Sequence, residues 1–329
     1  MLKLFGKNMG LQVLLILAVV LVLWWRPLMS PPAMALSEYD GVLYGLIVKM
    51  FGHLPRLAVV IAILFVLGEA VALNLLLADA GLVPQTTLLP TLLYIVGVSA
   101  PASTLSPMIL VNAILIVILY QLRIRGTLLT IPTEKICSAT ALIGICTMIY
   151  LPAAMFLISY ILVAVMFRLY GWRDWATLIL GLAAPYVLLL PVLYVTNHLD
   201  WWLAATSASI GQMGINIAGG DTLPLIANII LAAIIAISLI GLWGRLSEKT
   251  MQWQTNASTV MLLAVGGLGM LFCTQLLPVP LHFFAIPFAL CGTHLLLPER
   301  TRRTTGSRRS RNWIFDTLFF VILVAALLC

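Results

Sequence analysis

Long apolar segments recur along the whole chain, and most have about the length that a helix needs to cross a lipid bilayer. A transmembrane helix takes about 20 mostly apolar residues, so segments of this kind leave little room for anything else in 329 residues. Apolar residues make up 62% of the chain and charged residues only 9%, whereas soluble domains carry about a quarter charged residues. We therefore expect one all-α integral membrane domain over residues 1–329, a polytopic transmembrane helical bundle.

The apolar segments number about eleven, within a range of 9–12, because several are short enough to bend or to re-enter the membrane. They lie at 9–25, 57–78, 87–100, 107–122, 136–150, 152–168, 174–195, 223–244, 257–277, 281–297 and 312–328. With these spans, 15 of the 18 Lys and Arg residues fall on one side, and only Arg26, Lys49 and Arg56 fall on the other. By the positive-inside rule the N-terminus is inside and the C-terminus outside, which is the pattern of a multi-pass protein of the bacterial inner (cytoplasmic) membrane.

Three loops stand out in this topology. Residues 26–56 form an exterior loop in which apolar side chains recur at helical spacing, so we expect an amphipathic surface helix near residues 40–52. Residues 196–222 form an exterior polar loop, and residues 298–311 form a basic cytoplasmic loop. We expect Arg300 to Arg311 to face anionic lipids of the inner leaflet. The basic residues lie in short loops between apolar segments, so no nucleic-acid partner is expected.

The acidic residues of the first exterior loop are the candidate catalytic residues. Glu38 and Asp40 lie just before the surface helix, and only Asp200 and Asp221 join them on the predicted outer side. A carboxylate there can act as general base towards a hydroxyl or amine, and a second one can hold a divalent cation on a phosphate leaving group. Capping of the following helix explains Glu38 and Asp40 equally well, because acids are favoured at helix N-termini.

Three further residues are candidates for binding a substrate. Arg56 and His53 lie near Glu38 and Asp40 in sequence, and an arginine there is suited to a phosphate group. Glu69 lies well inside the second span, where an ionisable group is costly and points to function. The alternative for Glu69 is a packing role, with a hydrogen bond to Asn112, Gln121 or a serine.

The four histidines do not suit a metal centre. His282 and His294 are twelve residues apart on one predicted span, which separates them by about 18 Å at 1.5 Å per residue. The remaining histidines, His53 and His198, come from different loops with no HxxH or HExxH spacing. We expect no metal site and no cofactor, except a divalent cation if the protein is a transferase.

Three segments in the middle of the chain carry a resemblance. Residues 141–152, 167–175 and 181–186 read ALIGICTMIYLP, FRLYGWRDW and GLAAPY. They are similar to a family of uncharacterised multi-pass inner-membrane proteins typical of Bacteroidetes, a domain of unknown function. The resemblance covers most of the chain and implies no known activity.

The order of elements resembles a second group. One span, an exterior loop with acids and a surface helix, a second span that begins at an arginine, and then short paired spans are how GT-C glycosyltransferases begin. The resemblance implies a polyprenyl-phosphate-linked sugar as donor at the outer face, with the exterior acid as base or metal ligand. By position this role falls on Glu38 or Asp40, although Tyr39 separates the two acids here.

Two functions therefore remain open. The first is a GT-C-like membrane transferase that uses Asp40 and Glu38, with Arg56 on the phosphate. The second is a non-enzymatic scaffold or a permease subunit of a cell-envelope complex, whose protein partners the sequence does not identify. A deep outward cavity with Glu38 and Asp40 at its rim, on which Arg56 or His53 converges, favours the first function. A solvent-facing helix cap or a polar passage at Glu69 favours the second.

Overall fold

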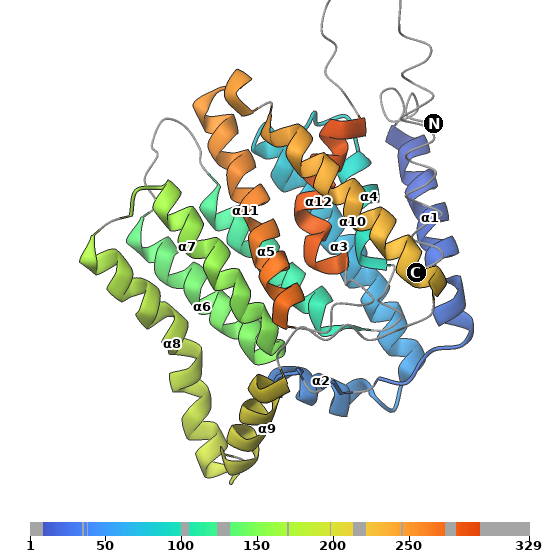
Figure 1. Cartoon of the computed structure of the whole chain (residues 1–329). Helices are drawn as coiled ribbons and strands as arrows, with labels where there is room; N and C mark the ends of the chain where they lie inside the picture. The colour runs from blue at the N-terminus through green and yellow to red at the C-terminus, as the bar shows by residue number, and fades with distance from the viewer. Residues whose placement is uncertain are drawn as a thin grey trace, which may run out of the picture.

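The computed structural model describes most of the chain, and the regular secondary structure of the described residues is all helical, with one isolated β-bridge (Figure 1). This confirms the all-α fold class. The described residues are 9–34, 36–37, 39–99, 105–123, 132–169, 171–197, 199–212, 222–244, 246–273 and 281–296.

Twelve α-helices and three short 3₁₀ helices follow one another in the described residues. The α-helices are α1 (Met9–Met29), α2 (Val42–Phe51), α3 (Pro55–Asp79), α4 (Leu89–Ser99), α5 (Pro107–Leu122), α6 (Thr133–Ile149), α7 (Phe156–Met166), α8 (Trp172–Val195), α9 (Leu199–Gln212), α10 (Thr222–Trp243), α11 (Met251–Cys273) and α12 (Ala285–Leu296). The 3₁₀ helices are η2 (Leu151–Met155), η3 (Leu246–Glu248) and η4 (Leu281–Phe284).

The predicted apolar segments correspond closely to these helices. Each of the ten that begin before residue 300 overlaps one α-helix, and the predicted surface helix near residues 40–52 is α2. Among the described residues, α1, α3 and α8 are each long and apolar enough to cross a membrane. The last predicted segment, 312–328, and the basic loop 298–311 lie outside the described residues.

Helix α1 packs on the bundle through a narrow stripe. Its buried side chains are Gln12, Ile16, Val20 and Trp24, which recur every four residues and therefore share one face of the helix. The amide of Gln12 ties this face to the loop before α4: its Nε2 donates to the Thr86 carbonyl oxygen at 3.2 Å, and its Oε1 accepts from the Leu88 N–H at 2.8 Å. The polar side chain is thus buried with both groups bonded.

The centre of the bundle is formed by α4 and α12, which lie between α3, α5 and the helices α10 and α11 (Figure 1). Every α4 side chain from 89 to 98 is buried, as are most side chains of α12. A helix that is apolar on all faces belongs in a core, since no face of it suits water. Helices α4 and α12 are short, in agreement with the short predicted segments 87–100 and 281–297.

A second group consists of α6, α7 and α8, which lie together at one side (Figure 1). Helices α6 and α8 approach closely because Gly181 has no side chain: a Cβ there would overlap the Thr140 hydroxyl and lie 2.5 Å from the Cys137 carbonyl oxygen. Helix α8 then ends at Thr196, and Asn197 adopts the left-handed conformation with φ of 55°. Asparagine tolerates this conformation better than most residues, and the chain turns there into α9.

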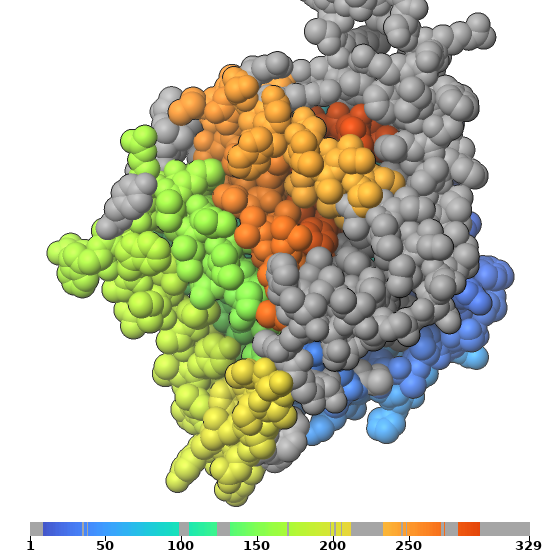
Figure 2. Space-filling model, viewed as in Figure 1, coloured from blue at the N-terminus to red at the C-terminus, as the bar shows by residue number. Residues whose placement is uncertain are grey.

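Helix α9 corrects one prediction. Residues 196–222 were expected to be a polar loop, but Leu199–Gln212 is helical. The serines, threonines and small residues of this stretch concealed the helix, because they give it no clear apolar stripe. In the space-filling view, α8 and α9 form the projecting lower edge of the molecule (Figure 2). Helix α2 crosses the same end of the bundle, near α9 (Figure 1).

Candidate functional site

The loop before α2 is held against the end of α6 by backbone hydrogen bonds. Asp40 and Tyr150 form the isolated antiparallel bridge, in which the Gly41 N–H donates to the Ile149 carbonyl oxygen at 2.8 Å and the Leu151 N–H donates to Tyr39 at 3.0 Å. Helix α6 ends here because Pro152 follows and Tyr150 is extended. The backbone groups freed at this end are the ones that fix Asp40 in place.

Gly41 makes this pairing sterically feasible. Its φ of −82° is open to any residue, but a Cβ at this position would overlap the carbonyl group of Met148. The close approach of two backbones therefore requires glycine. On the other side, the hydroxyl of Tyr44 donates to the Leu105 carbonyl oxygen at 2.9 Å and anchors α2 to the chain before α5.

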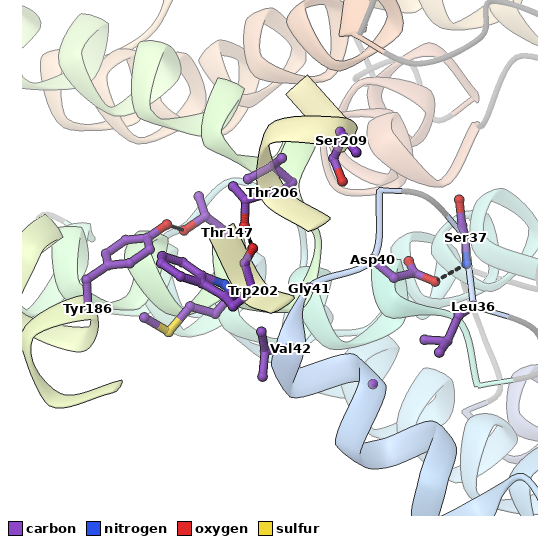
Figure 3. A pocket seen from close by; sticks show the side chains of 14 residues that line it. Leu36, Ser37, Asp40, Gly41, Val42, Thr147, Tyr186, Trp202, Thr206 and Ser209 are labelled. Carbon is purple, nitrogen blue, oxygen red and sulfur yellow. Dashed lines mark hydrogen bonds between the residues drawn. The ribbon is translucent and has the colours of Figure 1, made fainter. Parts of the chain in front are cut away.

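A cavity of about 450 Å³ lies at this junction, a size ordinary for a small-molecule site. Its walls come from the loop before α2, the start of α2, the end of α6, the middle of α8 and α9 (Figure 3). The lining residues are Leu36, Ser37, Asp40, Gly41, Val42, Gly45, Thr147, Met148, Leu151, Tyr186, Trp202, Thr206, Ala208 and Ser209. Asp40 is thus the predicted acid that the structure places at a cavity.

The carboxylate of Asp40 is bonded on one side only. Its Oδ2 accepts from the Ser37 N–H at 2.7 Å, whereas its Oδ1 is buried and has no hydrogen-bond partner among the described residues (Figure 3). Burial raises the pKa of Asp40 from 3.8 to about 6, against the opposing effect of the Ser37 bond. Burial, with the nearby Asp40 charge, also raises the pKa of the Tyr44 hydroxyl.

Asp40 does not cap α2. The N-cap residue is Gly41, and no side chain accepts a hydrogen bond at this helix end. The carboxylate instead bonds backward to the loop, at Ser37. The capping interpretation of Asp40 is therefore wrong, because its carboxylate lies on the cavity wall and not over the first turn.

The opposite wall carries an aromatic corner and hydroxyl groups. The rings of Tyr186 on α8 and Trp202 on α9 lie 6.5 Å apart between centroids, at an angle of 49°. The Tyr186 hydroxyl is hydrogen-bonded to the Thr147 hydroxyl at 2.5 Å, and Thr147 also donates to Gly144 at 2.6 Å. Aromatic faces beside hydroxyl groups suit a ligand with both apolar and hydroxyl-bearing sides.

Arg56 and His53, two of the predicted substrate-binding residues, lie elsewhere. His53 follows the C-terminal end of α2 and Arg56 is at the start of α3; both are exposed, and neither lines the cavity. The cavity adjoins the start of α2, and this helix of ten residues is about 15 Å long at 1.5 Å per residue. The structure thus brings neither residue to Asp40.

The other outer acids do not join Asp40 among the described residues. Asp200, in the first turn of α9, is exposed and does not line the cavity. Glu38 and Asp221 lie outside the described residues. In the described part of the chain, no three His, Cys, Asp or Glu side chains gather in a way that could hold a metal ion.

Glu69 belongs to a separate buried cluster. Its side chain is 5% exposed, and its Oε2 accepts from the Tyr94 hydroxyl at 2.7 Å. This partner was not among those proposed from the sequence: Asn112 donates instead to the His282 carbonyl oxygen at 3.2 Å, and Gln121 accepts from Ser138. Glu69 is not among the residues that line the cavity.

Several cavity residues escaped the sequence analysis. Thr147 and Tyr186 stand alone in apolar segments and resemble packing residues there, and Trp202 belongs to the pair 201–202 that is typical of a membrane interface. Only the fold brings them to Asp40. No protein-family model, curated protein or solved structure matches this chain, so its function has to be inferred from these residues.

Proposed function

We propose that this chain is a multi-pass protein of the bacterial inner membrane, with about eleven spans, the N-terminus inside and the C-terminus outside. The apolar surface of α8 supports a lipid environment, since Leu188 is 76% and Val195 79% exposed. The concentration of Lys and Arg on one side of the predicted spans supports this orientation of the two termini. Arg300 to Arg311 would then contact anionic lipids of the inner leaflet.

In this membrane the protein would act as a GT-C-like transferase on a polyprenyl-phosphate-linked sugar at the outer face. Asp40 would be the general base. It would accept the proton of an acceptor hydroxyl while the hydroxyl oxygen forms a bond to the anomeric carbon. The bond from that carbon to the phosphate oxygen breaks, and polyprenyl phosphate leaves with the electron pair. Oδ1 is covered in the structure, so the carboxylate must turn into the cavity for this step.

The proposal depends on one observation, the environment of Asp40. Its half-buried carboxylate lies on the wall of a cavity, has one oxygen without a partner among the described residues, and has a pKa raised to about 6. General bases work best when their pKa lies near the working pH. An ordinary exposed aspartate is a weaker base by about two powers of ten. The environment of Asp40 is therefore suited to proton abstraction at neutral pH.

The test is turnover by the full-length protein in liposomes that contain polyprenyl-phosphate-linked hexoses as donors, with an alkyl glycoside added as the acceptor of the sugar and release of polyprenyl phosphate followed by mass spectrometry. We expect Asp40→Asn to lower the rate by about 10²–10⁴-fold, and Asp200→Asn, which alters an exposed acid on α9, to leave it unchanged. The wild-type rate should rise as the pH passes about 6 and Asp40 ionises. No release with any such donor, or full activity in Asp40→Asn, refutes the transferase.

A second function is favoured by a different observation. Of the described residues that line the cavity, none is Lys, Arg or His, so no side-chain cation there neutralises a leaving phosphate. A non-enzymatic scaffold or permease subunit of a cell-envelope complex needs no such cation. In that case the cavity would bind a headgroup without reaction, and the turnover assay would show no release.

A further inference from the structure

The charge of the cavity limits what it can hold. Among its described lining residues, Asp40 is the single side chain with a formal charge at neutral pH. Residues 213–221, which follow the α9 wall, contain no Lys, Arg or His. Two anions a few ångströms apart repel strongly where water is scarce, and a bound phosphate here would meet Asp40 with no cation to compensate.

The basic residues of the predicted outer side do not compensate the negative charge of Asp40 in the cavity. Arg26, Lys49 and Arg56 are all exposed, and none lines the cavity. Lys49 and Arg56 lie near the far end of α2 from the cavity. In the transferase reaction the anomeric carbon must reach the hydroxyl that faces Asp40, so the donor phosphate would lie at the mouth of the cavity and not at these cations.

The remaining lining groups suit an uncharged ring with hydroxyl groups. Trp202 offers an apolar aromatic face, and the hydroxyls of Ser37, Thr206 and Ser209 have lone pairs for hydrogen bonds. The hydroxyl pair of Thr147 and Tyr186 extends this polar edge. A sugar ring has such a surface, with C–H groups on its faces and hydroxyls at its rim.

We infer that the cavity is the acceptor subsite: it binds an uncharged sugar or similar polyol ring against Trp202, with one ring hydroxyl presented to Asp40, and it excludes the phosphate of the donor. The inference rests on the proposed function for the role of acceptor. The binding itself requires only the cavity, so it can be tested without turnover.

The test compares two probes with the same alkyl chain, hexyl β-glucoside and hexyl phosphate. The full-length protein is reconstituted in phosphatidylcholine nanodiscs, and binding is measured by saturation-transfer difference NMR. We expect the glucoside to bind at least about tenfold more tightly than the phosphate. Trp202→Ala should weaken glucoside binding about tenfold, whereas Trp202→Phe, which keeps an aromatic face, should retain most of it. Trp243→Ala, at an exposed position on α10, is the matched control and should change nothing.

Asp40→Asn gives the second arm of the test. Removal of the charge should leave glucoside affinity within about threefold and raise hexyl phosphate affinity by more than that, because the repulsion disappears while a neutral acceptor group remains. Phosphate binding to the wild type that equals or exceeds glucoside binding overturns the inference. So does glucoside binding that is absent, or that Trp202→Ala does not weaken.

These outcomes are separable from those of the turnover assay. Glucoside binding through Trp202 without release of polyprenyl phosphate refutes the transferase and leaves the ring subsite standing. Release that depends on Asp40, together with glucoside binding that is independent of Trp202, refutes the subsite alone.

Discussion

Replacement of Asp40 by asparagine should stabilise the folded protein at neutral and alkaline pH. The pKa of this carboxyl group is raised from 3.8 to about 6 by burial, which means that the fold disfavours its charged form. At about 1.4 kcal/mol per tenfold change in proton affinity, the difference corresponds to about 3 kcal/mol. Asp40 is only half-buried, and screening by water lowers this value, so we expect a gain of about 1–2 kcal/mol in the free energy of unfolding.

The sign of the pH dependence follows from the same shift. Well below pH 3.8 the carboxyl group is protonated in both states and its burial costs nothing. Between pH 3.8 and about 6 the unfolded state has lost the proton while the folded state still holds it, so stability falls as the pH rises and reaches its lower plateau above about 6. Asp40→Asn removes this dependence, and its advantage should be full at about pH 8, smaller at about pH 4.5 and absent only well below pH 3.8.

The measurement is reversible unfolding in mixed micelles at about pH 8 and pH 4.5, followed by tryptophan fluorescence. Asp200→Asn is the matched control, an exposed acid on α9 whose replacement should change the free energy by less than about 0.5 kcal/mol. If the bond from the Ser37 N–H to the charged carboxylate outweighed the cost of burial, its replacement by the weaker bond to the neutral asparagine oxygen would instead cost about 1 kcal/mol. Destabilisation of Asp40→Asn at about pH 8, or a gain that does not depend on pH, would refute the reasoning.

Two further pairs of replacements test the structure around and away from the cavity. Gly41→Ala should destabilise the protein by about 2 kcal/mol or more and lower its accumulation, because the new Cβ overlaps the Met148 carbonyl group; Gly68→Ala, on α3 with open space around it, should be neutral or stabilising by up to about 1 kcal/mol. Tyr94→Phe should cost about 1–3 kcal/mol by removing the donor to buried Glu69, whereas Glu69→Gln keeps an acceptor and should cost less. Equal losses for the two members of either pair, measured by the same unfolding assay, would contradict these assignments.

The helices could be predicted because their signal is local. An apolar segment such as Pro55–Asp79 carries the length and composition of its helix in its own residues. Helix α9 could not be predicted in this way, since its stretch of Ser, Thr, Ala and Gly is neither apolar nor clearly periodic. Its helix depends on the turn at Asn197, where one residue in the left-handed conformation redirects the chain. Such a turn depends on the φ angle of one residue, which the pattern of apolar residues does not predict.

The site depended on contacts that the sequence does not reveal. Asp40 was a candidate because acids are rare outside the predicted membrane, but rarity alone could not separate a base from a helix cap. The distinction came from the structure around Asp40: its backbone pairs with that of Tyr150, 110 residues away, and its carboxylate accepts from the Ser37 N–H and not from the first turn of α2. The same pairing places Arg56 at the other end of α2, although it lies only 16 residues from Asp40. Tyr150 is far from Asp40 in sequence but adjacent in space, whereas Arg56 is near in sequence but lies at the other end of α2, so separation along the chain did not predict the site. The chemistry to test at Asp40 is proton transfer beside an uncharged ring.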